Sequence, residues 1–209
     1  MAKHFELLRS LEKSSQEPVE TKVAGVLPAW LSGSLFKNGT GRYEYPNKNY
    51  KHLFDGHACI HKFSIAGGKV VYSNKMLGTK SYTRSLAKNR LYPVFGTSDL
   101  SSNVFGRLRT VFNFDSTMDN VNVNVVPYGN DQIYALTEFN YMCQVDPHTL
   151  DIVDTLNVKK DIPTVSTASA HPHLDDEGWI MCGYNARRLR ICYEFTRFSQ
   201  APNEPVRLG

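Results

Sequence analysis

Two histidines separated by one residue, His171 and His173 in the sequence Ala170-His-Pro-His, form the pair in the chain most suited to metal binding. Alternate side chains of a β-strand point to the same face and lie about 6.6 Å apart. Both imidazoles can therefore reach one metal ion, or one can bind the metal while the other supports it. The alternative is a pair of loop histidines near the turn 175–178, and the spacing alone does not choose between the two.

Other titratable residues give less specific signals. His57 and His61 are four residues apart, but the local pattern predicts a strand, in which four residues span roughly 13 Å, too far for one metal. We therefore expect His61 to pack or to form a hydrogen bond, and His57 to be exposed. Glu138 follows an apolar strand, where its carboxylate either orients a metal-bound histidine or is simply exposed at the strand end.

The segment 102–114 has the pattern of an amphipathic helix. Five apolar residues share one face, and Arg107 and Arg109 lie off it. Such a helix lies in a membrane interface or packs on the core, and both interpretations stay open. The chain has no run of 18 apolar residues and its first 20 residues are polar, so we expect no transmembrane helix and no secretory signal. We expect a cytoplasmic protein, and the first of these interpretations adds peripheral membrane contact through 102–114.

Composition excludes several classes of function. The 209 residues are 41% hydrophobic and carry a net charge of +4, which is typical of a globular protein. No dense stripe of Lys and Arg is present, so we expect no nucleic-acid partner. The four cysteines are widely spaced without a CxxC pair, which argues against a zinc cluster and for reduced thiols. No nucleophile elbow, dinucleotide fingerprint or P-loop occurs.

The elements that must position these residues are almost all strands. Alternation and turn chemistry predict a hairpin over 58–76 around Gly67-Gly68 and another around residues 186–188. Only 83–90 and 102–114 have a helical pattern. Further strands are expected at 34–37, 121–125, 133–137, 141–145 and 152–158. Strands at this spacing predict an all-β sandwich, barrel or propeller. Residues 1–22 are expected to be a polar, partly flexible lead-in, and residues 23–209 to form the β domain.

Four segments in order resemble the carotenoid cleavage oxygenase family, which includes β-carotene oxygenases and the retinoid isomerohydrolase of the retinal pigment epithelium. They are 28–41 (PAWLSGSLFKNGTG), 52–63 (HLFDGHACIHKF), 119–124 (DNVNVN) together with 136–140 (LTEFN), and 168–173 (ASAHPH). The resemblance implies a seven-bladed β-propeller with loops and helices covering one face. It also implies a central ferrous iron held by four histidines, three of which are supported by glutamates.

Carried over by position, the resemblance assigns a role to four residues. His171 matches the first iron ligand, whereas His173 matches a position that does not bind iron. Glu138 matches a supporting glutamate that holds a histidine other than the first. Thr137 matches a position lining the site near the open coordination position of the iron, and Phe54 matches an aromatic residue near the substrate tunnel. Thr40 stands where the family usually has proline.

The activity implied by the resemblance is that of an iron(II) dioxygenase. It would use O₂ to split a conjugated double bond of a carotenoid or apocarotenoid into two carbonyl products. The apolar polyene would enter from a membrane surface. A retinoid isomerohydrolase is the alternative within the family.

Length limits how much of such a propeller this sequence can form. One four-stranded blade takes about 40–50 residues, so 209 residues predict roughly three blades. We therefore expect an N-terminal portion that is inactive alone, with three more ligands downstream, because one imidazole cannot hold iron against water. The alternative from another class is a truncated, non-catalytic product with a binding or regulatory role.

Overall fold

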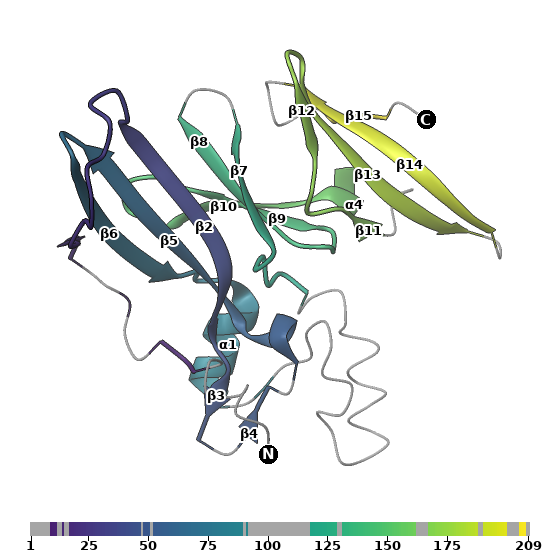
Figure 1. Ribbon diagram of the computed structural model, residues 1–209. Helices are drawn as coiled ribbons and strands as arrows, with labels where there is room; N and C mark the ends of the chain where they lie inside the picture. Colours follow the sequence, from purple (N-terminus) through teal and green to yellow (C-terminus); the bar gives the residue numbers. More distant parts are fainter. Residues whose placement is uncertain are drawn as a thin grey trace.

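The computed structural model of the chain describes residues 9–11, 14, 17–46, 48–50, 52–89, 91, 118–128, 131–161, 167–187, 190–199 and 205–207. Within these residues, three antiparallel β-sheets follow one another along the chain, and the helices are short (Figure 1). The prediction of an all-β chain is confirmed. The predicted helix over 102–114 lies outside the described residues.

The first sheet has the strand order β1-β6-β5-β2, built from β1 (Val19–Glu20), β6 (Lys69–Met76), β5 (His57–Ala66) and β2 (Gly33–Arg42). Strands β5 and β6 form the predicted hairpin, and its two-residue turn is Gly67-Gly68. Both glycines have positive φ, 56° and 75°. A type I′ turn requires this conformation, which glycine adopts without steric cost. The turn thus sets the register of the hairpin.

Segments around the first sheet complete this part of the chain. Strand β1 lies within the predicted lead-in 1–22 and pairs with β6, while the domain division at residue 22 stays a prediction. Strands β3 (Glu44–Tyr45) and β4 (Lys48–Asn49) form a small separate hairpin. The 3₁₀-helix η2 (Leu53–Asp55) precedes β5.

Helix α1 (Lys80–Lys88) begins three residues before the predicted helix over 83–90. Thr79 is its N-cap, and the carboxylate of Asp119 accepts hydrogen bonds from the first two helical N–H groups, at 2.6 and 3.0 Å. These contacts satisfy donors that an α-helix leaves unpaired at its start. Asp119 is almost forty residues away in sequence, so the local pattern could not show where the helix begins.

The second sheet has the order β10-β9-β8-β7, from β10 (Ile152–Asn157), β9 (Tyr141–Val145), β8 (Gln132–Leu136) and β7 (Asn124–Tyr128). The valine alternation predicted a strand from residue 121, but β7 begins three residues later. The residues before it bind the turn that precedes β5, through side-chain amides that are described below. The short helix α4 (158–161) follows β10.

The third sheet contains the second predicted hairpin. It has the order β11-β13-β14-β15, and β12 also pairs with β13. The strands are β11 (Thr167–Ala168), β12 (His173–Asp175), β13 (Gly178–Arg187), β14 (Arg190–Ser199) and β15 (Pro205–Arg207). Strands β13 and β14 pair over their full lengths.

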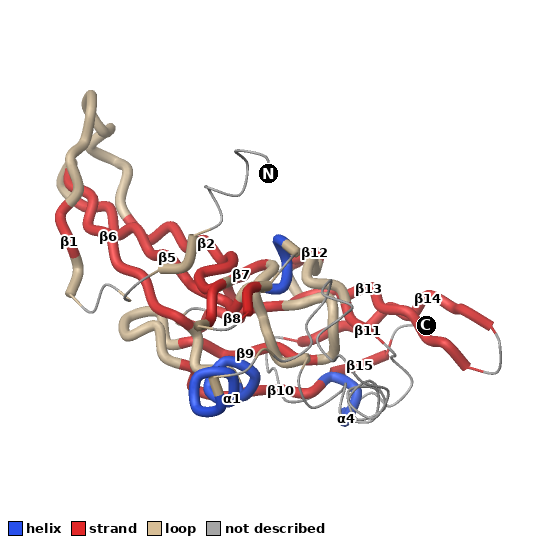
Figure 2. Tube along the Cα trace, turned by 90° about the horizontal axis from the view of Figure 1, so that it is seen from below, coloured by secondary structure: helices blue, strands red, loops and turns tan. Residues whose placement is uncertain are grey.

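Each sheet packs its apolar face against the next, as the blades of a β-propeller do. Buried side chains of the first sheet, such as Ile60, pack with those of the second, such as Ala135. Between the second and third sheets, the buried indole of Trp179 lies edge-on to Tyr128 and Tyr134, with ring centroids 4.6 and 5.4 Å apart. Figure 2 shows the strands of the three sheets following one another across the molecule, with α1 and α4 on the same side. The described residues therefore form three consecutive blades.

Candidate functional site

All four residues assigned from the resemblance line one cavity of about 400 Å³. The cavity lies where the three sheets meet. Strand β2 contributes residues 38–40, η2 contributes Leu53 and Phe54, and the chain before β7 contributes residues 122 and 123. Thr137 and Glu138 come from the end of β8, and His171 from the link between β11 and β12. The volume is within the usual range of small-molecule sites.

The backbone of His171 is constrained on both sides. The hydroxyl of Ser169 accepts a hydrogen bond from the His171 N–H at 3.1 Å, and the carbonyl of the buried Ala170 accepts one from Asn124 Nδ2 at 2.9 Å. Pro172 follows, and its ring restricts the preceding residue to extended conformations. These constraints direct an imidazole that is itself 67% exposed. An exposed ring on a fixed backbone can bind a ligand without first losing packing contacts.

Glu138 faces this imidazole. Its Oε1 lies 3.7 Å from His171 Nε2, which is longer than a hydrogen bond but close enough for electrostatic attraction. The carboxylate is 42% exposed, so water screens part of that attraction. Its neighbour Thr137 is buried. The resemblance implies that Glu138 holds a histidine other than the first, and that pairing stays a prediction.

Phe54 forms part of the apolar wall of the cavity. Its N–H donates to His52 Nδ1 at 3.2 Å, which caps the start of η2. Its carbonyl accepts a hydrogen bond from Asn122 Nδ2 at 2.8 Å. The ring is half-exposed, so it lies at the edge of the cavity and not in a closed core. A substrate could cover it without displacing protein side chains.

Sequence reasoning missed a network of asparagines around the cavity. Asn120 Nδ2 donates to the Gly56 carbonyl at 3.0 Å, and its Oδ1 accepts from the Ala58 N–H at 2.9 Å. Asn122 donates to the same Gly56 carbonyl at 3.1 Å. The sequence does contain a signal for this network, because asparagine occupies every second position from 120 to 124. The sequence analysis used this pattern only as evidence for a strand. Buried amide groups require partners, and here those partners lie on neighbouring sheets.

Among the residues that the structure describes, the other histidines do not line the cavity. His57 is fully buried, so the expectation of an exposed side chain was wrong. Its ring packs edge-on to Tyr50, whose hydroxyl lies 3.3 Å from Nε2. The His61 Nδ1 lies 2.7 Å from the Tyr72 hydroxyl, which confirms the expected hydrogen bond. The prediction for His57 and His61 rested on strand spacing alone. Spacing shows how far apart two residues of β5 lie, but it does not show which of them other segments of the chain bury.

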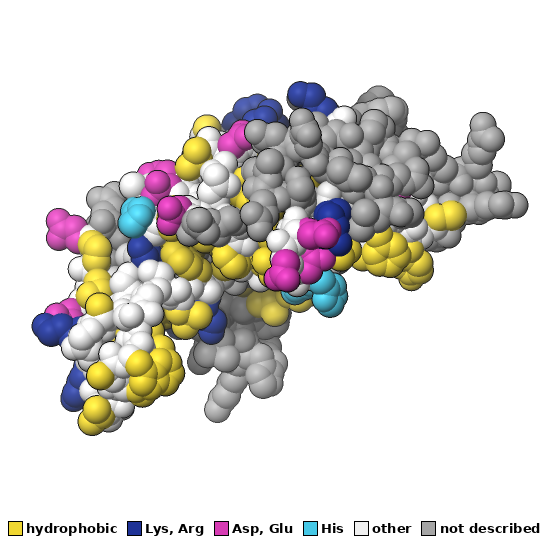
Figure 3. All heavy atoms as spheres, turned by 90° about the horizontal axis from the view of Figure 1, so that it is seen from above, with side chains coloured by type: hydrophobic (Ala, Val, Ile, Leu, Met, Phe, Trp, Pro, Cys, Tyr) yellow, Lys and Arg dark blue, Asp and Glu magenta, His cyan; other side chains and the backbone are white. Residues whose placement is uncertain are grey.

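His173 is exposed on β12 and does not line the cavity. It lies beside the turn to β13, where Arg197 forms ion pairs with Asp175 at 2.8 Å and Glu177 at 3.0 Å. Figure 3 shows acidic, basic and histidine side chains next to one another on this face of the molecule. The structure therefore separates the two histidines of the His-Pro-His motif, and only His171 faces the cavity.

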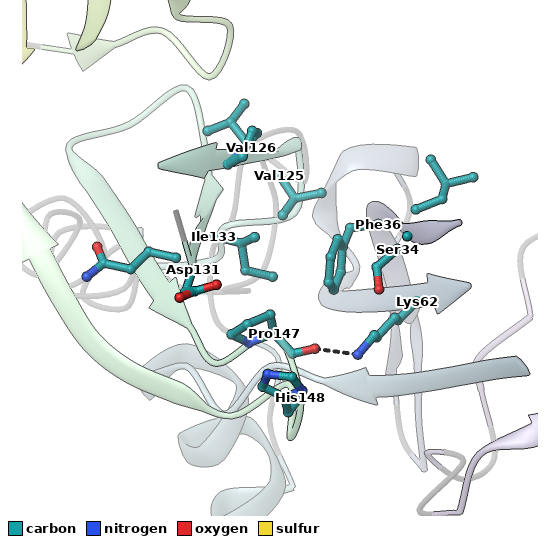
Figure 4. A pocket seen from close by; sticks show the side chains of 13 residues that line it. Ser34, Phe36, Lys62, Val125, Val126, Asp131, Ile133, Pro147 and His148 are labelled. Atoms are coloured by element: carbon teal, nitrogen blue, oxygen red, sulfur yellow. Dashed lines mark hydrogen bonds between the residues drawn. The ribbon is translucent and has the colours of Figure 1, made fainter. Parts of the chain in front are cut away.

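A second cavity, of about 620 Å³, lies between the first two sheets at the opposite ends of β2 and β7 (Figure 4). Phe36, Val125 and Ile133 form its apolar walls. Lys62 reaches across it and donates to the Pro147 carbonyl at 2.8 Å. This hydrogen bond connects the first sheet to the turn between β9 and β10. It crosses the second cavity, so Lys62 has a structural role there.

A metal centre requires several ligands in one place. Among the residues that the structure describes, no group of three His, Cys, Asp or Glu side chains is close enough to hold a metal ion. His171 and Glu138 are the two described residues with such side chains that line the cavity. The described residues do not form the complete four-histidine site that the resemblance implies.

Comparison with known proteins establishes the family. The model of the retinal pigment epithelial membrane protein family matches residues 8–207. The chain belongs to this family. Curated relatives include β,β-carotene 15,15'-dioxygenase of Mus musculus, 36% identical over 176 residues, which cover 81% of this chain and 31% of the relative. A mitochondrial carotenoid-cleaving dioxygenase of Pongo abelii is 37% identical over 212 residues. This match covers 97% of this chain and 37% of the length of the relative.

Solved structures of other proteins share the fold. A mutant of Synechocystis apocarotenoid oxygenase matches with a TM-score of 0.77 at 19% identity, over 97% of this chain and 43% of that one. The cobalt-substituted form of the Synechocystis protein matches with a TM-score of 0.75 at 20% identity, over 95% and 42%. These matches confirm that the three sheets are part of a propeller. The chain spans about a third of the length of the curated relatives above.

In the part of the chain that the structure describes, no helix is both long and apolar enough to span a bilayer. The segment 102–114, proposed for peripheral contact, lies outside that part.

Proposed function

We propose that this chain contributes part of the active site of an iron-dependent dioxygenase, which splits a conjugated double bond of a carotenoid or apocarotenoid into two carbonyl products. The observation that carries the proposal is the single cavity in which an exposed imidazole, a carboxylate and an apolar wall meet. The names of the curated relatives give the reaction class.

His171 is the proposed iron ligand of this chain. A neutral imidazole is a common ligand for iron, and this ring is accessible on a fixed backbone. The negative charge of Glu138 at 3.7 Å favours a cation beside the ring. Iron, when bound, supplies the activation of O₂. The further ligands of such a site are not among the described residues.

The apolar residues of the cavity are the proposed binding surface for the polyene. Leu53, Phe54 and Val123 offer hydrophobic surface, and a polyene covering it would remove that surface from water. The buried Thr137 lines the same cavity, at the position that the resemblance places near the open coordination site. These side chains would orient the double bond and exclude water around it.

The two histidines of one motif provide a matched pair of variants. We expect His171→Ala to abolish cleavage of β-carotene by the native protein that carries these residues, and His173→Ala to leave it intact, because only His171 lines the cavity. Chromatography of the products decides the reaction when β-carotene and a retinoid ester are offered separately. Two carbonyl fragments from β-carotene indicate cleavage, whereas an isomerised retinoid alcohol and a free acid from the ester indicate isomerohydrolysis. Cleavage at the wild-type rate by His171→Ala would refute the assignment.

Delivery of an apolar substrate requires contact with a lipid surface. We propose that segment 102–114 provides this contact as a basic amphipathic helix. A peptide of this segment is expected to gain helicity and to bind when anionic vesicles are added. A peptide that stays unstructured in solution with vesicles would instead support packing of the segment on the core.

A further inference from the structure

The main chain next to His171 is held by a residue of another sheet. Asn124, the first residue of β7, donates from Nδ2 to the carbonyl of Ala170 at 2.9 Å. Ala170 is fully buried, so this bond lies beneath the exposed ring of His171. Because the imidazole itself is largely free of packing, its direction depends on the main chain that carries it.

Asn124 is in turn held from two sides. Its Oδ1 accepts a hydrogen bond from the Val125 N–H at 2.9 Å. Its main-chain carbonyl accepts one from Asn38 Nδ2 at 2.8 Å, and the same Asn38 nitrogen binds the Val121 carbonyl at 2.6 Å. Asn38 belongs to β2. A continuous set of amide contacts therefore runs from the first sheet through the second to the link that carries His171.

We propose that Asn124 is a positioning residue, whose side-chain amide sets the direction in which His171 projects into the cavity, with Asn38 fixing Asn124. The assigned role of His171 in binding iron rests on the proposed function. The positioning itself rests on the hydrogen bonds alone. Partners that orient a metal ligand without touching the metal commonly change metal affinity by 10- to 100-fold when they are removed.

Asn120 provides a close control for this role, because it does not line the cavity. Its side chain also makes one bond as a donor and one as an acceptor, but the partners are the Gly56 carbonyl and the Ala58 N–H. Asn124→Ala and Asn120→Ala thus remove the same atoms and the same number of bonds. A generic loss of stability affects both variants alike, whereas a positioning role for His171 belongs to Asn124 alone.

The first readout is the proximity of the His171 ring to the Glu138 side chain, measured by nuclear Overhauser effects in the 209-residue chain. The two groups approach to 3.7 Å in the wild type. We expect Asn124→Ala to lose this contact and Asn120→Ala to keep it. Should the contact persist in Asn124→Ala, or disappear equally in both variants, the positioning role would be overturned.

The second readout is paramagnetic broadening of the His171 ring signals by Co²⁺ in the native protein that carries these residues, prepared without its iron, because the described residues do not form a complete metal site on their own. This broadening is a spectroscopic signature that reports metal at the imidazole. We expect Asn124→Ala to raise the Co²⁺ concentration for half-broadening by about tenfold, the lower end of the range for such partners, and Asn120→Ala to leave it unchanged. An unchanged value in Asn124→Ala would contradict the proposal. Absence of selective broadening in the wild type would refute the ligand role of His171, while the proximity measurement still decides the positioning role.

A more conservative variant covers the case in which Asn124→Ala does not fold. Asn124→Asp keeps the acceptor for the Val125 N–H and replaces only the donor to Ala170. We expect this variant to lose the contact between His171 and Glu138 as Asn124→Ala does. Retention of the contact would show that the bond to Ala170 does not set the direction of the ring, and would overturn the proposal.

Discussion

Replacing Gly56 by alanine tests the packing of the turn that carries the cavity wall. A methyl group on Gly56 would lie 2.5 Å from Thr40 Cγ2 and 2.8 Å from Tyr43 Cε1. It would also lie 2.9 Å from the main-chain oxygen of Arg42, which cannot move without shifting β2. The backbone of Gly56 has φ −66° and ψ 151°, which alanine adopts freely. The whole cost therefore arises from the contacts.

The magnitude follows from two contributions. Overpacking of this kind costs about 1–3 kcal/mol. The Gly56 carbonyl also accepts hydrogen bonds from Asn120 and Asn122, and displacing it would weaken two bonds that are each worth about 1 kcal/mol. We expect Gly56→Ala to lower the free energy of unfolding by about 2–4 kcal/mol, and the melting temperature by roughly 5–15 °C for a chain of this size.

Urea denaturation measures this loss, and Gly78 provides the control. A methyl group on Gly78 would meet no atom within 4 Å, and its φ is outside the left-handed region. We expect Gly78→Ala to change the free energy of unfolding by no more than about 0.5 kcal/mol, as for other unhindered sites. Equal stability of the Gly56→Ala and Gly78→Ala variants would refute the packing argument.

Two further predictions concern buried titratable groups. Burial, and then the charge of Arg42, lower the pKa of His57 to about 3, so below its ordinary pKa of about 6.5 the unfolded chain takes up a proton that the folded chain does not. Between pH 6.5 and 5, we expect the free energy of unfolding of the wild type to fall by about 2 kcal/mol more than that of His57→Phe. Urea denaturation at each pH measures this difference, and parallel pH profiles of the two proteins would contradict the prediction. Burial raises the pKa of the Cys59 and Cys143 thiols to about 12, so a thiol reagent should label the exposed Cys192 in the folded chain and label Cys59 and Cys143 only on unfolding. Rapid labelling of Cys59 or Cys143 under native conditions would show that these thiols are not buried.

Local signals were enough to predict most of the strands. The Gly67-Gly68 turn and the apolar alternation on either side of it predict β5 and β6, because glycine adopts the two successive positive φ angles of the turn without steric cost. The hairpin of β13 and β14 was likewise found from its pattern. In both cases, the interactions that define the element lie within one short stretch of chain.

Contacts between distant segments explain the failures. The start of α1 depends on Asp119, and the start of β7 depends on amides that bind the turn at Gly56. Burial of His57 results from tyrosines that a spacing argument does not consider. Within the candidate site, the four residues that the motif resemblance singled out all line one cavity. The role of Asn124 was missed because its hydrogen-bond partner, Ala170, is far away in the sequence.

The central claim is that His171 is an iron ligand in this cavity. The most direct test is the iron content per polypeptide of the native protein that carries these residues, compared among the wild type, His171→Ala and His173→Ala. We expect His171→Ala to lose its iron, because its imidazole is the proposed ligand, and His173→Ala to retain it. Full iron content in His171→Ala would show that this imidazole does not hold the metal.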